Sequence, residues 1–339
     1  MKIPLTLTTR KFVKSSSRMI QWPNPGIAVT MAVLSLGLAA QSQTINQSEA
    51  SGSFGSLSQY NSSITYANTL NVQPVACVPT SFANALTYLN TVNGGTVFQN
   101  SPNNYATVNT LAQDMGTSLN PTLNGGANGG TGYAPAVNGF LTYAGGGVGQ
   151  NLAPSVNIFG EYSTAAWGIG LPNGGAGFVQ AKPSAYTLGA ALSSQCAIEL
   201  GIQWGTYSGT TFTPDPLGGF HAVVMRSENL VNGAGFFGII DPISGADVLN
   251  DPNASAQFLP VSVTTVDGFL YLTYPTQLPD NPAEGSNDSF AAPNGESARV
   301  VADWVEFVPD STSTLPLLGI ALLGLGGLHR LTRRQISIA

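Results

Sequence analysis

Positive charge is scarce in the central part of this 339-residue chain. Of its 11 lysine and arginine residues, only Lys182, Arg226 and Arg299 lie between residues 19 and 329. The 17 acidic residues all fall between Glu49 and Asp310, so this central body is acidic. Nucleic-acid binding requires clustered basic side chains, so the chain is not expected to bind nucleic acid. Its acidity is best explained as an aid to solubility.

Cysteine and histidine are equally rare, with two of each. No cluster of cysteine, histidine and acidic residues has the spacing of a metal site, and glycine runs such as 145–147 lack the strand and helix that frame a phosphate loop. We therefore expect neither a metal nor another cofactor. In an exported chain, Cys77 and Cys196 allow two readings, a disulfide or a free reactive thiol at Cys77. The sequence around Cys77 favours the free thiol, and Cys196 is expected to be buried and inert.

The first 43 residues have the pattern of a secretory signal peptide. A basic region from Lys2 to Arg18 is followed by an apolar run, Ile27 to Ala40, and then by small and polar residues. We expect cleavage between Ala40 and Gln43. A retained membrane anchor is the alternative, but the run is short for a membrane span.

The C-terminal residues 308–339 form a three-part tail. Val308-Pro-Asp-Ser311 precedes an apolar segment, 315–328, and a basic end with Arg330, Arg333 and Arg334. This arrangement resembles the PEP-CTERM class of bacterial sorting signals in its Val-Pro-Asp-Ser variant. The resemblance implies an exosortase-type processing enzyme as a partner, transient anchoring in the membrane, and a protein exposed at the cell surface or released outside. A plain membrane anchor is the alternative reading.

A helix is expected to begin close to Cys77. Pro79 suits the first helical turn, where a missing N–H costs nothing, and an apolar face follows at helical spacing, formed by Phe82, Ala85, Leu86 and Leu89. A thiol at a helix N-terminus lies at the positive end of the helix dipole, which favours the thiolate. Cys77 is therefore the candidate nucleophile.

His221 is the only histidine in the body of the chain, because His329 lies in the tail. It opens an expected strand, and Asn232-Gly233 predicts a hairpin that returns to Asp241. The hairpin would bring His221 and Asp241 together, although a one-residue slip of register would place them on opposite faces. Asn229 and Asp247 are the next candidates to orient the histidine.

Together, Cys-x-Pro-Thr-Ser on a helix, Gly-x-His opening a strand and Asp-Pro closing the next resemble the papain-like cysteine peptidases. The branch that removes double-glycine leaders from bacteriocins is the most similar. The resemblance covers residues 73–242 and implies that Cys77 is the nucleophile, His221 the base, Asp241 its orienting group and Gln73 an oxyanion-stabilising side chain. The chain departs from the family at Val78, where a glycine is usual.

These observations predict an α+β protein with the papain-like fold, in which a helical N-terminal half precedes an antiparallel sheet. Helices are expected near 105–115, 135–143 and 183–194, and strands at 197–204, 221–226, 235–240, 261–266, 269–274 and 300–307. The predicted layout is a signal peptide (1–43), a mobile lead-in (44–70), the peptidase-like domain (71–307) and the sorting tail (308–339).

The expected function is that of an exported thiol hydrolase acting on peptide or isopeptide bonds of a peptide or protein substrate. Acyl transfer would use the same residues. The competing reading is a non-catalytic surface or matrix protein with a degenerate peptidase fold, which Val78 and the Asn- and Gly-rich body keep open.

Overall fold

The computed structural model describes nine stretches of the chain, all of which belong to one compact unit, Ser42–Ala339. They are residues 44–65, 75–117, 130–145, 156–163, 178–208, 211–214, 220–243, 251–274 and 297–308. The signal peptide, Gln73, Asp247 and the tail beyond Val308 lie outside the described residues. The predictions made for them therefore stay predictions.

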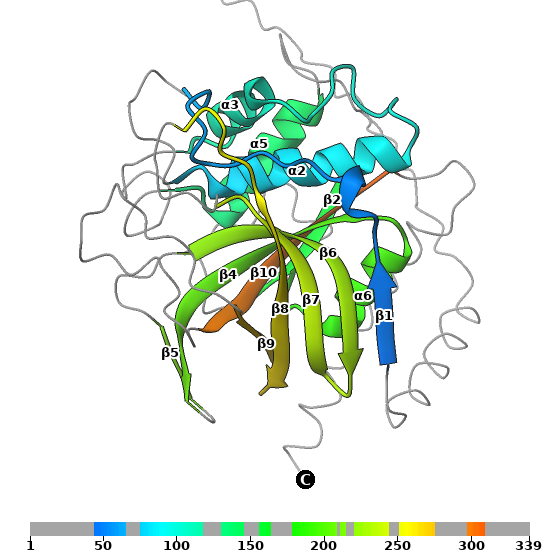
Figure 1. Ribbon diagram of the computed structural model, residues 1–339, viewed down its shortest axis with the longest axis vertical. Coiled ribbons are helices and arrows are strands. Elements are labelled where there is room, and N and C mark those ends of the chain that lie inside the picture. Colours follow the sequence, from blue (N-terminus) through cyan, green and yellow to red (C-terminus); the bar gives the residue numbers. More distant parts are fainter. Residues whose placement is uncertain are drawn as a thin grey trace, which may run out of the picture. The chain divides into compact units, whose positions relative to one another are not determined.

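An antiparallel sheet dominates the fold (Figure 1). Its strands are β1 (Thr44–Ser48), β2 (Asn157–Tyr162), β3 (Phe178–Gln180), β4 (Ala197–Ser208), β5 (Thr211–Pro214), β6 (Phe220–Val231), β7 (Ala234–Asp241), β8 (Gln257–Val266), β9 (Phe269–Thr273) and β10 (Ser297–Phe307). Every pairing is antiparallel except that of β2 with β3. The six strands expected from sequence periodicity are all present.

The sheet closes on itself, which overturns the expected fold class. Neighbouring strands run in the order β10, β9, β8, β7, β6 and β4, and β4 pairs in turn with β10 from Ala197↔Glu306 to Gly205↔Ser297. The result is a closed six-stranded β-barrel. The described residues include only four α-helices, so the expected papain-like α+β fold is wrong. Closure leaves none of these six strands as a free edge along its full length.

Three of the helices form a layer on the outside of the barrel: α2 (Cys77–Val92), α3 (Tyr105–Asp114) and α5 (Tyr133–Gly145) (Figure 1). Helix α2 packs directly on β4, β6 and β10, and α3 packs on both α2 and α5. The short helix α6 (Ala185–Ser193) packs on β1, β4 and β6. Ser184 and Thr187 form a capping box at the start of α6, which fixes where the helix begins.

Two apolar cores follow from the alternation of side chains along the strands. The barrel core fills the inside and includes Leu200, Trp204, Val223, Leu270 and Leu272. The helix-side core lies between the barrel wall and the helices and includes Phe82, Leu86, Phe140, Val224 and Trp304. The strands under the helices are therefore buried on both faces, and buried acidic residues, Glu199 on β4 and Asp303 and Glu306 on β10, lie among their apolar side chains.

The hairpin predicted from Asn232-Gly233 is confirmed, and a second hairpin of the same kind lies at Asp267-Gly268. Asn232 and Gly233 have φ angles of 53° and 78° and connect β6 to β7, and Asp267 and Gly268 have φ angles of 49° and 73° and connect β8 to β9. Positive φ at both central residues is the geometry whose twist matches paired antiparallel strands.

Residues 44–65 are packed, although their composition predicts a mobile lead-in. β1 pairs with the second half of β6, from Thr44↔Val231 to Ser48↔Ser227. Further along, both main-chain groups of Leu57 bond the side chain of Asn84 on α2, at 2.8 and 3.0 Å. The Gln59 amide donates to the Pro242 carbonyl at 2.9 Å. Polar composition did not predict order here because the stabilising contacts are backbone pairs and one buried amide side chain.

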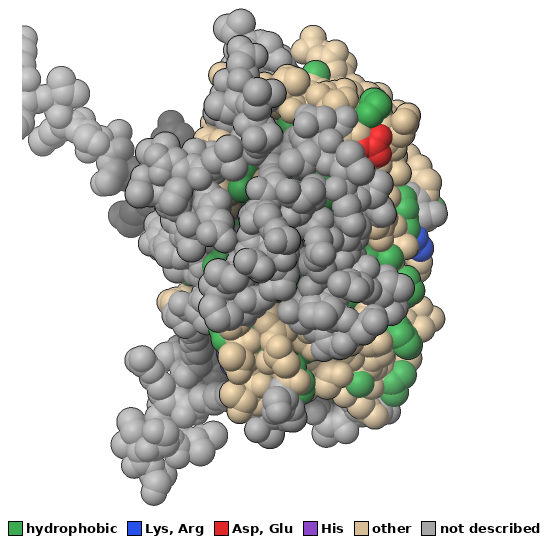
Figure 2. Space-filling view, turned by 60° about the vertical axis from the view of Figure 1, so that its left-hand side comes forward, with side chains coloured by type: hydrophobic (Ala, Val, Ile, Leu, Met, Phe, Trp, Pro, Cys, Tyr) green, Lys and Arg blue, Asp and Glu red, His purple; other side chains and the backbone are tan. Residues whose placement is uncertain are grey.

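The described part of the face shown in Figure 2 bears little charge. On the face shown in Figure 2, hydrophobic and uncharged polar atoms prevail among the described residues, and acidic or basic side chains are isolated. Within the described ranges, no helix combines the length and the hydropathy needed to cross a membrane.

Candidate functional site

Cys77 is the first residue of α2, as expected. The apolar face of the helix is fully buried at Phe82, Ala85, Leu86 and Leu89, which anchors its first turn against the barrel. Residue 76 is alanine and supplies no side-chain cap, in contrast to Asn104 and Ser184 at the starts of α3 and α6. Pro79 has no N–H and the Thr80 amide donates to the Ala76 carbonyl at 3.1 Å, so the Cys77 and Val78 amides are the first-turn donors that an anion at Cys77 would use.

His221 and Asp241 lie on neighbouring strands, and a β-bulge sets their relative position. From the turn, β6 and β7 pair regularly as far as Ser227↔Gly238, and the register then shifts by one residue at Arg226. Beyond the bulge the last pair is Val224↔Ile240. The next residues in this register, Val223 and Asp241, are therefore opposite each other.

The bulge places the two site residues on the same face of the sheet. His221 is two residues from Val223, and residues two apart on a strand point to the same side. Val223 belongs to the barrel core, so His221 and Asp241 both face the barrel side. A regular ladder would instead place Asp241 opposite Val224, whose side chain belongs to the helix-side core. The bulge thus decides between the two registers that the sequence allowed, and it selects the one in which His221 and Asp241 share a face.

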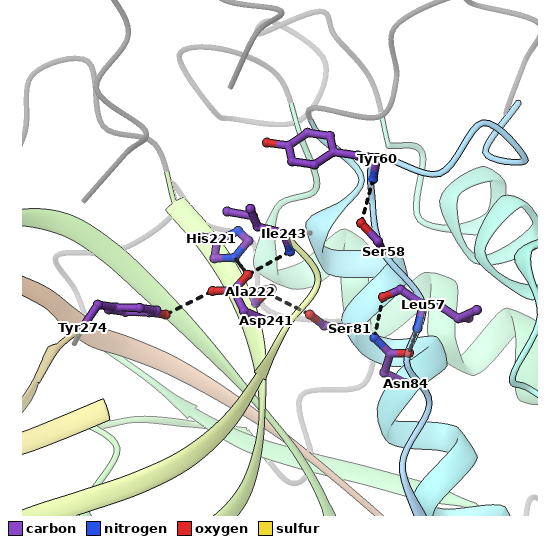
Figure 3. Close-up of polar contacts among 10 residues, drawn as sticks. All are labelled: Leu57, Ser58, Tyr60, Ser81, Asn84, His221, Ala222, Asp241, Ile243 and Tyr274. Atoms are coloured by element: carbon purple, nitrogen blue, oxygen red, sulfur yellow. Dashed lines mark hydrogen bonds and ion pairs between the residues drawn. The ribbon is translucent and has the colours of Figure 1, made fainter. Parts of the chain in front are cut away.

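The Asp241 carboxylate is held by three donors (Figure 3). Its Oδ1 lies 2.8 Å from His221 Nε2 and accepts from the Ile243 amide at 2.9 Å. Its Oδ2 accepts from the Tyr274 hydroxyl at 3.3 Å. Asp241 is completely buried, and a buried carboxylate of this kind is stable only when its oxygens have such partners.

The His221 ring lies between Asp241 and Cys77. Because Nε2 is engaged by Asp241, Nδ1 is the ring nitrogen left for the thiol. Burial lowers the pKa of His221, but the Asp241 charge and the hydrogen bonds with Asp241 and Cys77 outweigh it and raise the pKa to about 10. The ring is therefore an imidazolium at neutral pH, beside the Cys77 thiol.

One further hydrogen bond ties the helix to the strand. Ser81 lies one helical turn after Cys77 and donates through Oγ to the carbonyl of Ala222, the residue after His221, at 2.8 Å (Figure 3). The Ser81 and Ala222 side chains are both fully buried. This bond fixes the start of α2 relative to the start of β6, and so the thiol relative to the imidazole.

The structure thus brings together Cys77, His221 and Asp241, but not the alternative orienting residue Asn229. Asn229 is exposed and lies eight residues along β6 from His221, a separation of about 26 Å at the rise of a strand. Val78, which departs from the family pattern, is 1% exposed and packs in the helix-side core. Cys77 and Cys196 are both free, so they do not form a disulfide. Burial raises the pKa of Cys196 to about 12, in agreement with an unreactive thiol.

Two residues near the site were not predicted from the sequence. Tyr274 contacts Asp241, and the Trp204 ring stacks on the His221 ring with centroids 6.0 Å apart. Both occupy apolar positions in alternating strands, where an aromatic residue is most simply explained as core. β4 lies beside His221 because it pairs with β6, with Ile202 opposite His221, and the sequence predicted neither this pairing nor the position of β9.

Within the described ranges, no group of three or more cysteine, histidine or acidic residues is arranged to hold a metal ion. Comparison with protein-family models and with curated proteins finds no match for this chain. The site must therefore be interpreted from its own chemistry.

Proposed function

We propose that the chain is a thiol hydrolase in which Cys77 is the nucleophile, His221 the general base and acid, and Asp241 the orienting group. The substrate class is a peptide or isopeptide bond. The single observation that supports this most is the position of the His221 ring, bonded through Nε2 to a buried carboxylate and interacting with the one thiol that opens a helix. Nucleophile, base and orienter in hydrogen-bonded sequence are the recurring arrangement for acyl-transfer catalysis.

The proposed reaction has two stages. In the ion pair with the His221 imidazolium, the Cys77 thiolate attacks the carbonyl carbon, a C–S bond forms, and the carbonyl electrons move onto oxygen. The tetrahedral species collapses as the C–N bond breaks, and the His221 imidazolium gives its proton to the leaving amine. Water then attacks the thioester while the neutral His221 accepts its proton, and the C–S bond breaks. The carboxylic acid leaves, and the Cys77 thiolate and the His221 imidazolium are restored.

The developing oxyanion needs donors near Cys77. The Cys77 amide is the first candidate, because a first-turn amide has no intrahelical acceptor and lies at the positive end of the helix dipole. Gln73, four residues earlier, is the side chain that the resemblance implies, and it lies outside the described residues.

We further propose that the protein acts outside the cell. The support is sequence-based: the signal-like residues 1–43, and the tail in which Val308-Pro-Asp-Ser311 precedes an apolar segment and three arginines. An exosortase-type enzyme is the proposed partner for processing, and the membrane is a transient anchor before cleavage.

The main alternative is a binding or structural protein that keeps the three residues without using them. The burial of the site supports this reading, since Cys77 is 7% and His221 4% exposed. Catalysis requires a substrate carbonyl to reach the Cys77 sulfur. A measurement of activity therefore distinguishes the two functions.

Peptide cleavage tests the proposal directly. The full chain and its Cys77→Ala variant are incubated with a defined peptide mixture, and new termini are detected by mass spectrometry. The proposal expects cleavage products that disappear in Cys77→Ala and persist in Cys196→Ala. Products in which an added amine replaces water would identify acyl transfer. Identical peptide profiles for the full chain and Cys77→Ala would favour the non-catalytic alternative.

A further inference from the structure

The Asp241 carboxylate has a different environment at each oxygen. Oδ1 serves His221 and the Ile243 amide, which follows Asp241 by two residues and is positioned by the local chain. Oδ2 accepts from Tyr274, which directly follows β9 and lies 33 residues further along the chain. Rotation of the carboxylate about its Cβ–Cγ bond would break all three contacts. Among the described residues, the Tyr274 hydroxyl is the side-chain donor at Oδ2, while His221 contacts Oδ1 (Figure 3).

Tyr274 is itself fixed by packing. It is 4% exposed, and its ring lies 5.1 Å from the Trp204 ring, which stacks in turn on His221 at an interplanar angle of 21°. Burial, followed by the Asp241 charge and hydrogen bond, raises the pKa of Tyr274 well above its ordinary value. The hydroxyl therefore keeps its proton, and acts only as a donor to Asp241, throughout the range in which the site would work.

We propose that Tyr274 is a positioning residue of the Cys77–His221 site. Its hydroxyl holds the Asp241 carboxylate so that Oδ1 stays on His221 Nε2, and Nδ1 thereby stays directed to the thiol. This inference rests on the proposed function, because a positioning role has meaning only if the pair reacts. Tyr274 touches no reacting atom and acts through Asp241.

The test is Tyr274→Phe, which removes one oxygen and retains the ring that packs on Trp204. The readout is the second-order rate of Cys77 alkylation by iodoacetamide in the folded full chain, measured from pH 5 to pH 10. We expect the rate at neutral pH to fall by about two- to tenfold, the range of one hydrogen bond to a buried group. We also expect the alkaline limb of the profile to move to lower pH, because a carboxylate free to rotate stabilises the imidazolium less.

A matched control is Tyr271→Phe. Tyr271 lies on β9, three residues before Tyr274, and is 7% exposed. Its ring is tilted by 31° against that of Tyr207, with centroids 4.6 Å apart. Its loss of a hydroxyl should leave the profile unchanged. In Asp241→Asn, adding Tyr274→Phe should have a much smaller effect on the rate than it has in the parent protein, since the two residues would act through one contact.

The failures are distinguishable. If wild-type Cys77 reacts no faster than a free thiol, the proposed function fails. If wild-type Cys77 reacts fast and depends on His221, but Tyr274→Phe matches the wild type or shifts its alkaline limb upward, only the positioning role is overturned. Nitrogen-15 NMR of the imidazole gives a second readout. The Nε2 proton of His221 should exchange with water faster in Tyr274→Phe than in Tyr271→Phe, and equal exchange would contradict the proposal.

Discussion

His221 Nε2 and Asp241 Oδ1 lie 2.8 Å apart because a single extra residue, Arg226, shifts the register between their strands. The hairpin turn alone would direct the two side chains to opposite faces. β-Bulges commonly redirect a side chain in this way next to a functional site. The bulge therefore converts an ordinary hairpin into one that pairs a base with its orienting carboxylate.

Replacement of His221 by glutamine should remove the enhanced reactivity of Cys77. The amide of Gln still offers a donor to Asp241, so the buried carboxylate is not left without a partner. A free thiol with a pKa of about 8.5 is only a few per cent ionised at pH 7, so alkylation should slow by on the order of tenfold or more. Iodoacetamide labelling followed by peptide mass spectrometry measures this rate. An unchanged rate in His221→Gln would mean that the pair does not function.

Loss of the bond between Ser81 and Ala222 should loosen the connection between α2 and β6. Ser81→Ala is expected to lower the free energy of unfolding by about 1 kcal/mol and to slow Cys77 alkylation as well. Thr91→Ala is the control, because Thr91 lies on the same helix and donates to Thr87 at 2.8 Å but is exposed. Denaturant unfolding and labelling rates are measured together. If Ser81→Ala changes stability without changing the labelling rate, the bond has no role in alignment.

Stability should decline as the pH rises. Burial raises the pKa of Glu306 from 4.5 to about 8, and burial also raises the pKa of Glu228 to about 8. Between pH 4.5 and 8 the folded state retains protons that the unfolded chain releases, so stability present below pH 4.5 is lost as the pH approaches 8. The pKa of His221 is raised from 6.5 to about 10, so its deprotonation also lowers stability as the pH rises from 6.5 to about 10. The free energy of unfolding should therefore be larger at pH 5 than at pH 9.

Glu306→Gln should flatten this dependence. The glutamine amide is neutral at every pH, so the variant lacks one of the groups whose ionisation opposes folding. Each unit by which folding raises a pKa corresponds to about 1.4 kcal/mol in the free energy of unfolding. Asp267→Asn, in the exposed turn between β8 and β9, is the matched control and should leave the slope as it is. Chemical denaturation at a series of pH values checks both. A parallel pH profile for Glu306→Gln and wild type would refute the assignment.

Local features of the fold were predictable because they depend on neighbouring residues. The helix at Cys77, the Asn232-Gly233 turn and the strand that opens at His221 all follow from spacing and turn chemistry. These features also identified Cys77, His221 and Asp241 as candidates, and the structure brings the three together.

Long-range features were not predictable. The pairing of β4 with β10 joins Trp204 to Ala298, almost a hundred residues later, and side-chain alternation tells which face is buried but not which strand is the neighbour. The bulge at Arg226 adds one residue without changing composition. The contact between Tyr274 and Asp241 depends on the strand order of the barrel and on the bulge. Local sequence patterns therefore identify Cys77, His221 and Asp241 but do not predict the barrel that positions them.

The tail prediction can be checked independently of the site. If Val308-Pro-Asp-Ser311 is a processing motif, protein recovered from its native host should lack the apolar segment 315–328 and the arginines after it. Charged groups cross the hydrocarbon core poorly, so the arginines would stay on the inner side while the motif faces outward. Intact-mass measurement decides the question. A mass that still includes residues 315–339 would indicate a simple anchor instead.

The reactivity of Cys77 in the folded wild-type chain is the most direct test of the proposed site. Iodoacetamide is added at pH 7, and the alkylation of Cys77 and Cys196 is followed in the same sample by peptide mass spectrometry. We expect Cys77 to be labelled faster than a free cysteine and Cys196 to be labelled only after unfolding, because Cys196 is buried and its pKa is raised to about 12. Equal protection of both cysteines, or a disulfide between them in the isolated protein, would contradict the account.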